Sequence, residues 1–293
     1  MTELAQQPQD NRASWYLSAA ILGLKAIVGL WLVWQFVHSA EADAFTFSER
    51  FWWFCLAGFA AQLIDGALGM AHGVTCTTLL YQFGVSPAVA SASVHTAKVF
   101  TSGVSGLSHL MFRNVDMRLF VKLVIPGVVG SVAGAWLLSR VLDGSVVKPY
   151  IALYLLFLGV LILRKSFGKL LFREEVQRVG SLGFIGGLFD AIGGGGWGPI
   201  VTSNIIRQGK TPVMTIGTVN TAEFFVAICS TAVFLALLGT QGWEPLLGLI
   251  VGGVFAAPLG AYLVRIIQPR ILMGAVGIVI ILTSGYTVYQ SWF

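Results

Sequence analysis

Two aspartates lie inside long apolar segments of this 293-residue chain, and each is followed closely by glycines. Asp65 precedes residues 66–69 (GALG), and Asp190 precedes residues 191–196 (AIGGGG). A carboxylate inside a membrane is costly, so an acid at that depth marks a functional site by default. Two roles stay open for both acids: they can cap helix ends at the glycines, or they can bind a proton or a sodium ion.

The glycines after each aspartate predict a break in a helix, because glycine runs end helices. A half-helix is then expected to begin near Thr75 in the first segment and near Val201 in the second. Its free N–H groups and the positive end of its dipole favour an anion. The alternative is that the glycines only allow close helix packing. The candidate binding residues at the breaks are Gly69, His72, Gly73, Thr75, Gly193, Gly194, Gly195, Gly196 and Trp197.

The two broken segments are copies of one another. A shift of 125 residues aligns residues 58–97 with residues 183–222 without a gap, and twelve of the forty positions are identical. The shift pairs Asp65 with Asp190, and it pairs His72 with Trp197, either of which can line a cavity or only plug the loop. Close packing alone explains neither the repeat nor the acid beside each break, so we favour a binding site.

A second matched pair of polar clusters follows the breaks. The first holds His95, Thr96 and Lys98, and the second holds Asn220, Thr221 and Glu223. His95 and Asn220 can donate to an oxyanion, and the two threonines can donate or accept. Lys98 lies about one helical turn from His95, and Glu223 about one turn from Asn220, so each of these pairs shares a helix face. We expect a salt bridge between Lys98 and Glu223 in preference to direct contact of either with a ligand.

The composition predicts an all-α integral membrane protein. The chain is 56% hydrophobic and 11% charged, whereas a globular domain carries about 25% charged residues. No soluble domain is expected that would host an enzyme or bind nucleic acid. Seven apolar runs are long enough for transmembrane helices: 15–37, 88–111, 119–142, 149–163, 212–238, 245–264 and 270–289. The broken segments, 51–83 and 181–206, are interpreted as re-entrant hairpins of two half-helices each.

The distribution of charge predicts the orientation. With two hairpins, the segments on one side hold thirteen lysines and arginines and those on the other side hold three. By the positive-inside rule the N-terminus is cytoplasmic and the C-terminus lies outside. Residues 1–50 then form a tail, a first transmembrane helix and an outer loop. Residues 51–167 and 168–293 form two repeats, each a hairpin plus three spans, in opposite orientations.

Inverted repeats with broken helices at matching positions are the architecture of secondary transporters, whose site lies near the membrane midplane. The expected partners are a small anionic substrate, the lipid bilayer and a coupling ion, H⁺ or Na⁺; an oligomer is possible. No cofactor and no metal site is expected, because the sequence offers neither an HxxxH motif nor a cysteine pair with ligand spacing.

Several of these motifs resemble the TauE/SafE family of sulfite and organosulfonate exporters. The similar stretches are residues 58–73 with Asp65 and its glycines, residues 94–98 (VHTAK), residues 112–116 (FRNVD) and residues 189–199 (FDAIGGGGWGP). The resemblance covers about residues 50–290. It implies export of a small sulfur oxyanion or an organosulfonate across a bacterial inner membrane.

Other functions compete with this one. A transporter of another small anion or of a divalent metal cation fits the same architecture. An intramembrane protease is a rival of a different class, because residues 103–106 (GVSG) match the core of a serine-protease motif. That motif needs a histidine on a later helix, and no histidine follows His109. An aspartyl dyad of Asp65 and Asp190 lacks the GxGD motif. We therefore expect no enzyme.

Overall fold

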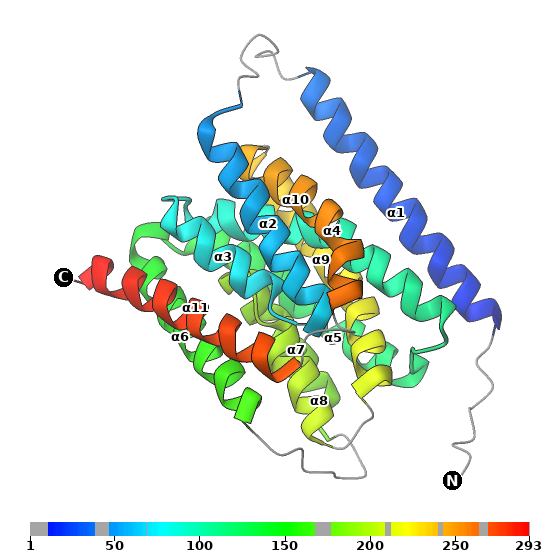
Figure 1. The fold of residues 1–293 in the computed structure, drawn as a ribbon. Helices are drawn as coiled ribbons and strands as arrows, with labels where there is room; N and C mark the ends of the chain where they lie inside the picture. The colour runs from blue at the N-terminus through cyan, green and yellow to red at the C-terminus, as the bar shows by residue number, and fades with distance from the viewer. Residues whose placement is uncertain are drawn as a thin grey trace.

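The computed structural model describes residues 11–38, 47–68, 70–167, 177–208, 212–239, 243–263 and 269–292. Every element in these ranges is a helix, so the all-α class is confirmed (Figure 1). Gly69, one of the predicted site residues, lies outside the described residues. The helices are α1 (Asn11–His38), α2 (Glu49–Leu68), α3 (His72–Gln82), α4 (Pro87–Met111), α5 (Met117–Trp136), η2 (Leu137–Val141), α6 (Gly144–Phe167), α7 (Val179–Gly193), η3 (Trp197–Thr202), α8 (Ser203–Arg207), α9 (Pro212–Leu238), α10 (Trp243–Leu263) and α11 (Pro269–Trp292).

Four helical stretches within the described residues are long and apolar enough to cross a membrane. They lie in α1, in α5 together with η2, in α6 and in α9. Large apolar side chains are also exposed on the surface, for example Trp52 (67% exposed), Phe157 (59%) and Leu282 (67%). A surface of this kind belongs in lipid. The full layout of seven spans and two re-entrant hairpins stays a prediction.

The helix bounds follow the 125-residue shift far beyond the segment in which the sequence repeat is visible. α11 begins and ends 125 residues after α6 begins and ends, and α9 begins 125 residues after α4. The packing has the same pattern. α2 packs against α10, and α7, which is the counterpart of α2, packs against α5. α4 packs against α9 at the centre and α6 against α11, whereas α1 contacts α4 at the edge of the bundle (Figure 1).

The helix breaks lie a few residues later than the sequence suggested. α2 continues through Asp65 to Leu68, and α7 continues through Asp190 to Gly193. A single glycine inside a helix costs only about 1 kcal/mol, which packing can offset, so Gly66 does not end α2. The chain turns at Ala71 (φ 90°) and at Gly194 (φ 66°), where the backbone is left-handed.

Two further expectations about the hairpins were wrong in detail. The second arms begin at His72 and at Trp197, three or four residues before the predicted starts near Thr75 and Val201. The first arm of the first hairpin is also longer than a half-helix. α2 has 20 residues, and a helix of that length spans about 30 Å.

Candidate functional site

The two helix breaks pack directly against one another. An added Cβ on Gly73 would lie 2.5 Å from the carbonyl oxygen of Gly194, and one on Gly195 would collide with the backbone of Val74. Thr77 of α3 donates a hydrogen bond to the same Gly194 carbonyl (3.1 Å). Gly73, Gly194 and Gly195 therefore let two backbones approach more closely than any side chain would allow.

Asp190 is fully buried at the end of α7 and holds several partners. Its carboxylate accepts the backbone N–H of Trp197 (3.0 Å), which caps the second arm of the break. The ammonium of Lys98 lies 3.1 and 3.2 Å from its two oxygens. His95 Nε2 lies 3.1 Å from Oδ2, while His95 Nδ1 lies 2.8 Å from the carbonyl oxygen of Ser91.

Lys98 joins the second break to α9. Its Nζ lies 2.9 Å from Oε1 of Glu223, so the predicted ion pair between these residues is present in the structure. Ser102 donates to the other oxygen of Glu223 (3.3 Å). An added Cβ on Gly73 would lie 3.0 Å from Nζ, which places the ammonium against the first turn of α3. Lys98 is thus the centre of a cluster that contacts both breaks.

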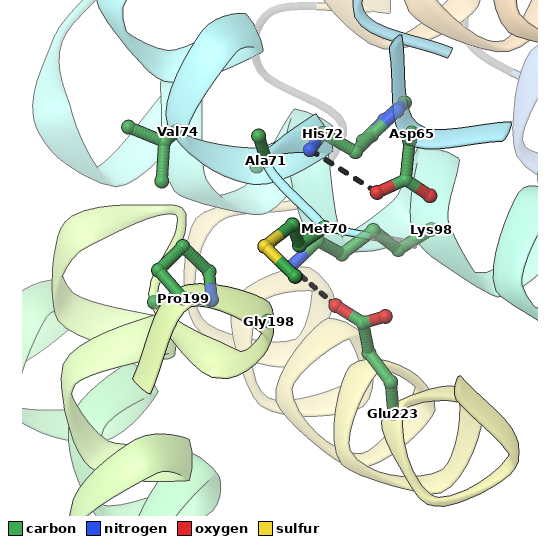
Figure 2. A pocket seen from close by; sticks show the side chains of 11 residues that line it. Asp65, Met70, Ala71, His72, Val74, Lys98, Gly198, Pro199 and Glu223 are labelled. Atoms are coloured by element: carbon green, nitrogen blue, oxygen red, sulfur yellow. Dashed lines mark hydrogen bonds and ion pairs between the residues drawn. The ribbon is translucent and has the colours of Figure 1, made fainter. Parts of the chain in front are cut away.

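Asp65 has fewer partners than Asp190. Its Oδ1 accepts the backbone N–H of His72 at 3.4 Å, which is a long hydrogen bond (Figure 2). This bond matches the one from the backbone N–H of Trp197 to Asp190. Both acids therefore cap the arm that begins seven residues further on. Among the described residues, no ion pair reaches Asp65, and its side chain is partly exposed.

A narrow pocket with a volume of about 10 Å³, room for about one water molecule, lies where the breaks and α9 meet. The residues that line it come from α2, the first break, α3, α4, the second break and α9 (Figure 2). The charged residues that line it are Asp65, Lys98 and Glu223. His72 also lines it, and the buried Nδ1 of its ring has no hydrogen-bond partner among the described residues. The remaining lining residues are Met70, Ala71, Gly73, Val74, Gly196, Gly198 and Pro199.

Of the predicted site residues, six line this pocket: Asp65, His72, Gly73, Lys98, Gly196 and Glu223. Several others are engaged elsewhere. The hydroxyls of Thr96 and Thr221 donate to carbonyls one turn earlier in their own helices. Asn220 donates to Ser105 (3.0 Å). The Trp197 ring is fully buried and its indole N–H donates to the carbonyl of Val219 (3.1 Å), so this residue plugs the core beside the break.

Two residues near the second break were missed by sequence reasoning. The ring of Tyr154 on α6 lies against Gly193, and its hydroxyl points to Gly196 and has no partner among the described residues. Lys165, near the end of α6, donates to the carbonyl of Pro199 (3.1 Å). The sequence held little signal for either, because a tyrosine within an apolar run and a lysine at its end are ordinary features of membrane helices.

The pocket can recognise a small charged ligand. It offers one ammonium, two carboxylates, a ring nitrogen of His72 and the bare backbone of Gly73. The carboxylates of Glu223 and Asp190 already form ion pairs with the ammonium of Lys98. An oxyanion can therefore reach Lys98 only when one of these carboxylates moves away or is neutralised. Within the described residues, no group of three or more His, Cys, Asp or Glu has the arrangement of a metal site.

Comparison with known proteins places this arrangement in a family. The chain is 45% identical over 249 residues to the "Probable membrane transporter protein YtnM" of Bacillus subtilis (strain 168), which covers 82% of this chain and 83% of the relative. It is 22% identical over 269 residues to the "Probable membrane transporter protein YunE" of the same organism (80% and 96%). No solved structure matches the chain. Residues 54–287 match the family described as "Sulfite exporter TauE/SafE". The chain therefore belongs to the TauE/SafE family and is a multi-pass membrane transporter.

Proposed function

We propose that this protein is a secondary-active transporter that exports a small sulfur oxyanion or an organosulfonate and couples export to an ion gradient. The observation that carries the proposal is the position of Lys98. Its ammonium lies between the two helix breaks, beside a pocket that His72 and Gly73 also line. A buried ammonium and a ring nitrogen without a partner among the described residues are groups that an oxyanion can engage.

The balance of charge supports coupling to a cation. With every group ionised, the charged residues that line the pocket are two carboxylates and one ammonium, a net charge of −1. An oxyanion added to this site is repelled unless one carboxylate is neutralised. We propose that H⁺ or Na⁺ binds at Asp65 or Glu223 as the oxyanion binds to Lys98. Asp65 is the better candidate, because among the described residues it has one long hydrogen bond and no ion pair.

The proposed mechanism is alternating access by two inverted halves in a bacterial inner membrane, with the N-terminus inside and the C-terminus outside. Support comes from the packing of helices across the two halves: α2 of the first half packs against α10 of the second, and α7 of the second half packs against α5 of the first. The breaks meet where these halves join, and a site in that position can be exposed to either side as the halves rock. The direction of net transport then follows the combined gradients of oxyanion, ion and membrane potential.

A substrate panel tests the proposal. Proteoliposomes that contain the purified protein are loaded with labelled sulfite, sulfoacetate or sulfate, and efflux is followed with and without imposed proton and sodium gradients. Faster efflux of sulfite or sulfoacetate than of sulfate, and a rate that depends on one gradient, is the expected result. Efflux no faster than from empty liposomes for every anion would reject it.

A cation transporter is a second candidate, because Asp65, Glu223 and Asp190 give the cluster more carboxylates than ammonium groups. Under this alternative the ammonium of Lys98 pairs with the carboxylates when no cation is bound, and an incoming cation displaces the ammonium. The same proteoliposomes distinguish the two functions. Uptake of a divalent cation or of sodium without any labelled oxyanion favours this alternative, whereas movement of the cation only together with the oxyanion favours the main proposal.

A further inference from the structure

The two halves differ at one matching place outside the pocket. An apolar groove with a volume of about 440 Å³ lies between α2, α3 and α11, which pack against one another (Figure 1). Trp53, Leu56 and Ile64 line it on α2, Leu79 on α3 and Val279 on α11. The volume lies within the range, about 300–1,000 Å³, found for cavities that hold drug-sized ligands.

At the corresponding place in the other half two aromatic rings stack on one another. The 125-residue shift pairs Val279 with Tyr154, and it pairs Ile64 with Phe189. The rings of Tyr154 and Phe189 stack with their centroids 5.3 Å apart. Tyr154 reaches the second break, where it lies against Gly193 and Gly196. In the groove, the smaller residues Ile64 and Val279 occupy the positions of this aromatic pair.

The groove opens onto the apolar surface of the protein. Its lining residues Trp53, Leu56 and Val279 are 55%, 54% and 43% exposed. Along α2 the lining extends from Trp53 to Ile64, roughly 17 Å at the rise of an α-helix. The exposed Arg50 lies one turn before Trp53, at the start of α2. A molecule suited to this place has a long apolar chain and an anionic head.

We propose that the groove binds one acyl chain of a membrane phospholipid, with the phosphate of its head group near Arg50. The surface on which the groove opens belongs to a membrane transporter, so phospholipid chains are the apolar molecules beside it. A bound chain lies along α3, the arm whose first turn lines the pocket. There the acyl chain packs beside the first break, as the rings of Tyr154 and Phe189 pack beside the second. This inference does not rest on the proposed substrate.

The test transplants the aromatic pair into the groove. The double variant Ile64→Phe/Val279→Tyr is compared with the wild type and with Ile278→Tyr. Ile278 is 49% exposed on α11 and is not among the groove residues, so this control adds the same ring outside the groove. Each protein is purified and washed in detergent. Retained lipid is identified by mass spectrometry, and thermal unfolding is followed on adding phosphatidylglycerol. The single variant Val279→Phe replaces the double variant if the latter does not fold.

The wild type and Ile278→Tyr are expected to retain phospholipid and to unfold at a higher temperature when phosphatidylglycerol is added, because a ligand of the native state stabilises it. The double variant should retain about one phospholipid fewer per protein, show less than half of that stabilisation, and be at least as stable as the wild type in detergent alone. Equal lipid retention and equal stabilisation in all three proteins would overturn the proposal. A retained free fatty acid without phospholipid would also overturn it.

Discussion

Asp65 and Asp190 lie 125 residues apart, and each accepts a backbone N–H from the residue seven positions further on, His72 at 3.4 Å and Trp197 at 3.0 Å. Within the described residues, only Asp190 is also paired with Lys98. Two acids in matching positions thus have different surroundings. Asp190 is held in a buried network, whereas Asp65 lies on the wall of the pocket.

This difference predicts unequal effects of two matched substitutions on stability. Asp190→Asn removes the charged partner of Lys98 and His95 in the fully buried network and should cost about 2–3 kcal/mol. Asp65→Asn keeps an oxygen that can accept the N–H of His72 and breaks no ion pair among the described residues, so it should change stability by no more than about 0.5 kcal/mol. Thermal unfolding of both variants in detergent measures the difference. Equal losses in the two would show that the acids are structurally equivalent.

Ala71 at the first break has a left-handed backbone, with φ at 90°. A residue with a Cβ pays roughly 1–2 kcal/mol for such a conformation, and glycine does not. Ala71→Gly should therefore leave stability unchanged or raise it by about 1 kcal/mol. Ala97→Gly, in the buried interior of α4, is the control and should lower stability by about 1 kcal/mol or more. A loss at position 71 as large as that at position 97 would contradict the strained backbone.

The contact between the breaks predicts that Gly195 is required for the full stability of the fold. A methyl group there would collide with the backbone of Gly73 and Val74, so Gly195→Ala should separate the breaks and lower the unfolding temperature. Gly285, within α11, has nothing within 4 Å of an added Cβ. Gly285→Ala should instead stabilise the protein by up to about 1 kcal/mol. If Gly195→Ala is as stable as the wild type, the breaks do not pack as described.

Reporter fusions test the predicted orientation. A reporter that is active only in the periplasm should give a signal when fused after Phe293 and none when fused at Gly168, because the positive charges gather on the side of the second position. The reverse pattern would contradict the orientation of both halves. Expression of each fusion is checked by immunoblot, so that a missing signal is not mistaken for a missing protein.

Much of the site could be predicted from the sequence, because acids and glycine runs are rare in membrane helices and the 125-residue shift gives their register. The same register predicted the pair of Lys98 and Glu223. The turn itself could not be located, since the helix runs through Gly66 and the left-handed residue of the first break is an alanine, which carries no signal. Thr96 and Thr221 illustrate another limit: from sequence alone, a hydroxyl that faces a ligand and one that bonds to its own helix are indistinguishable.

The account depends most on Asp65 as the residue that couples an ion to the oxyanion. Asparagine mimics the neutral acid, so Asp65→Asn should still exchange labelled sulfite for unlabelled sulfite across a proteoliposome membrane. It should no longer move sulfite in response to an imposed proton or sodium gradient. The decisive measurement is the ratio of gradient-driven transport to exchange in Asp65→Asn and in the wild type, at equal amounts of inserted protein. The account predicts a ratio near zero for the variant. An unchanged ratio would contradict it.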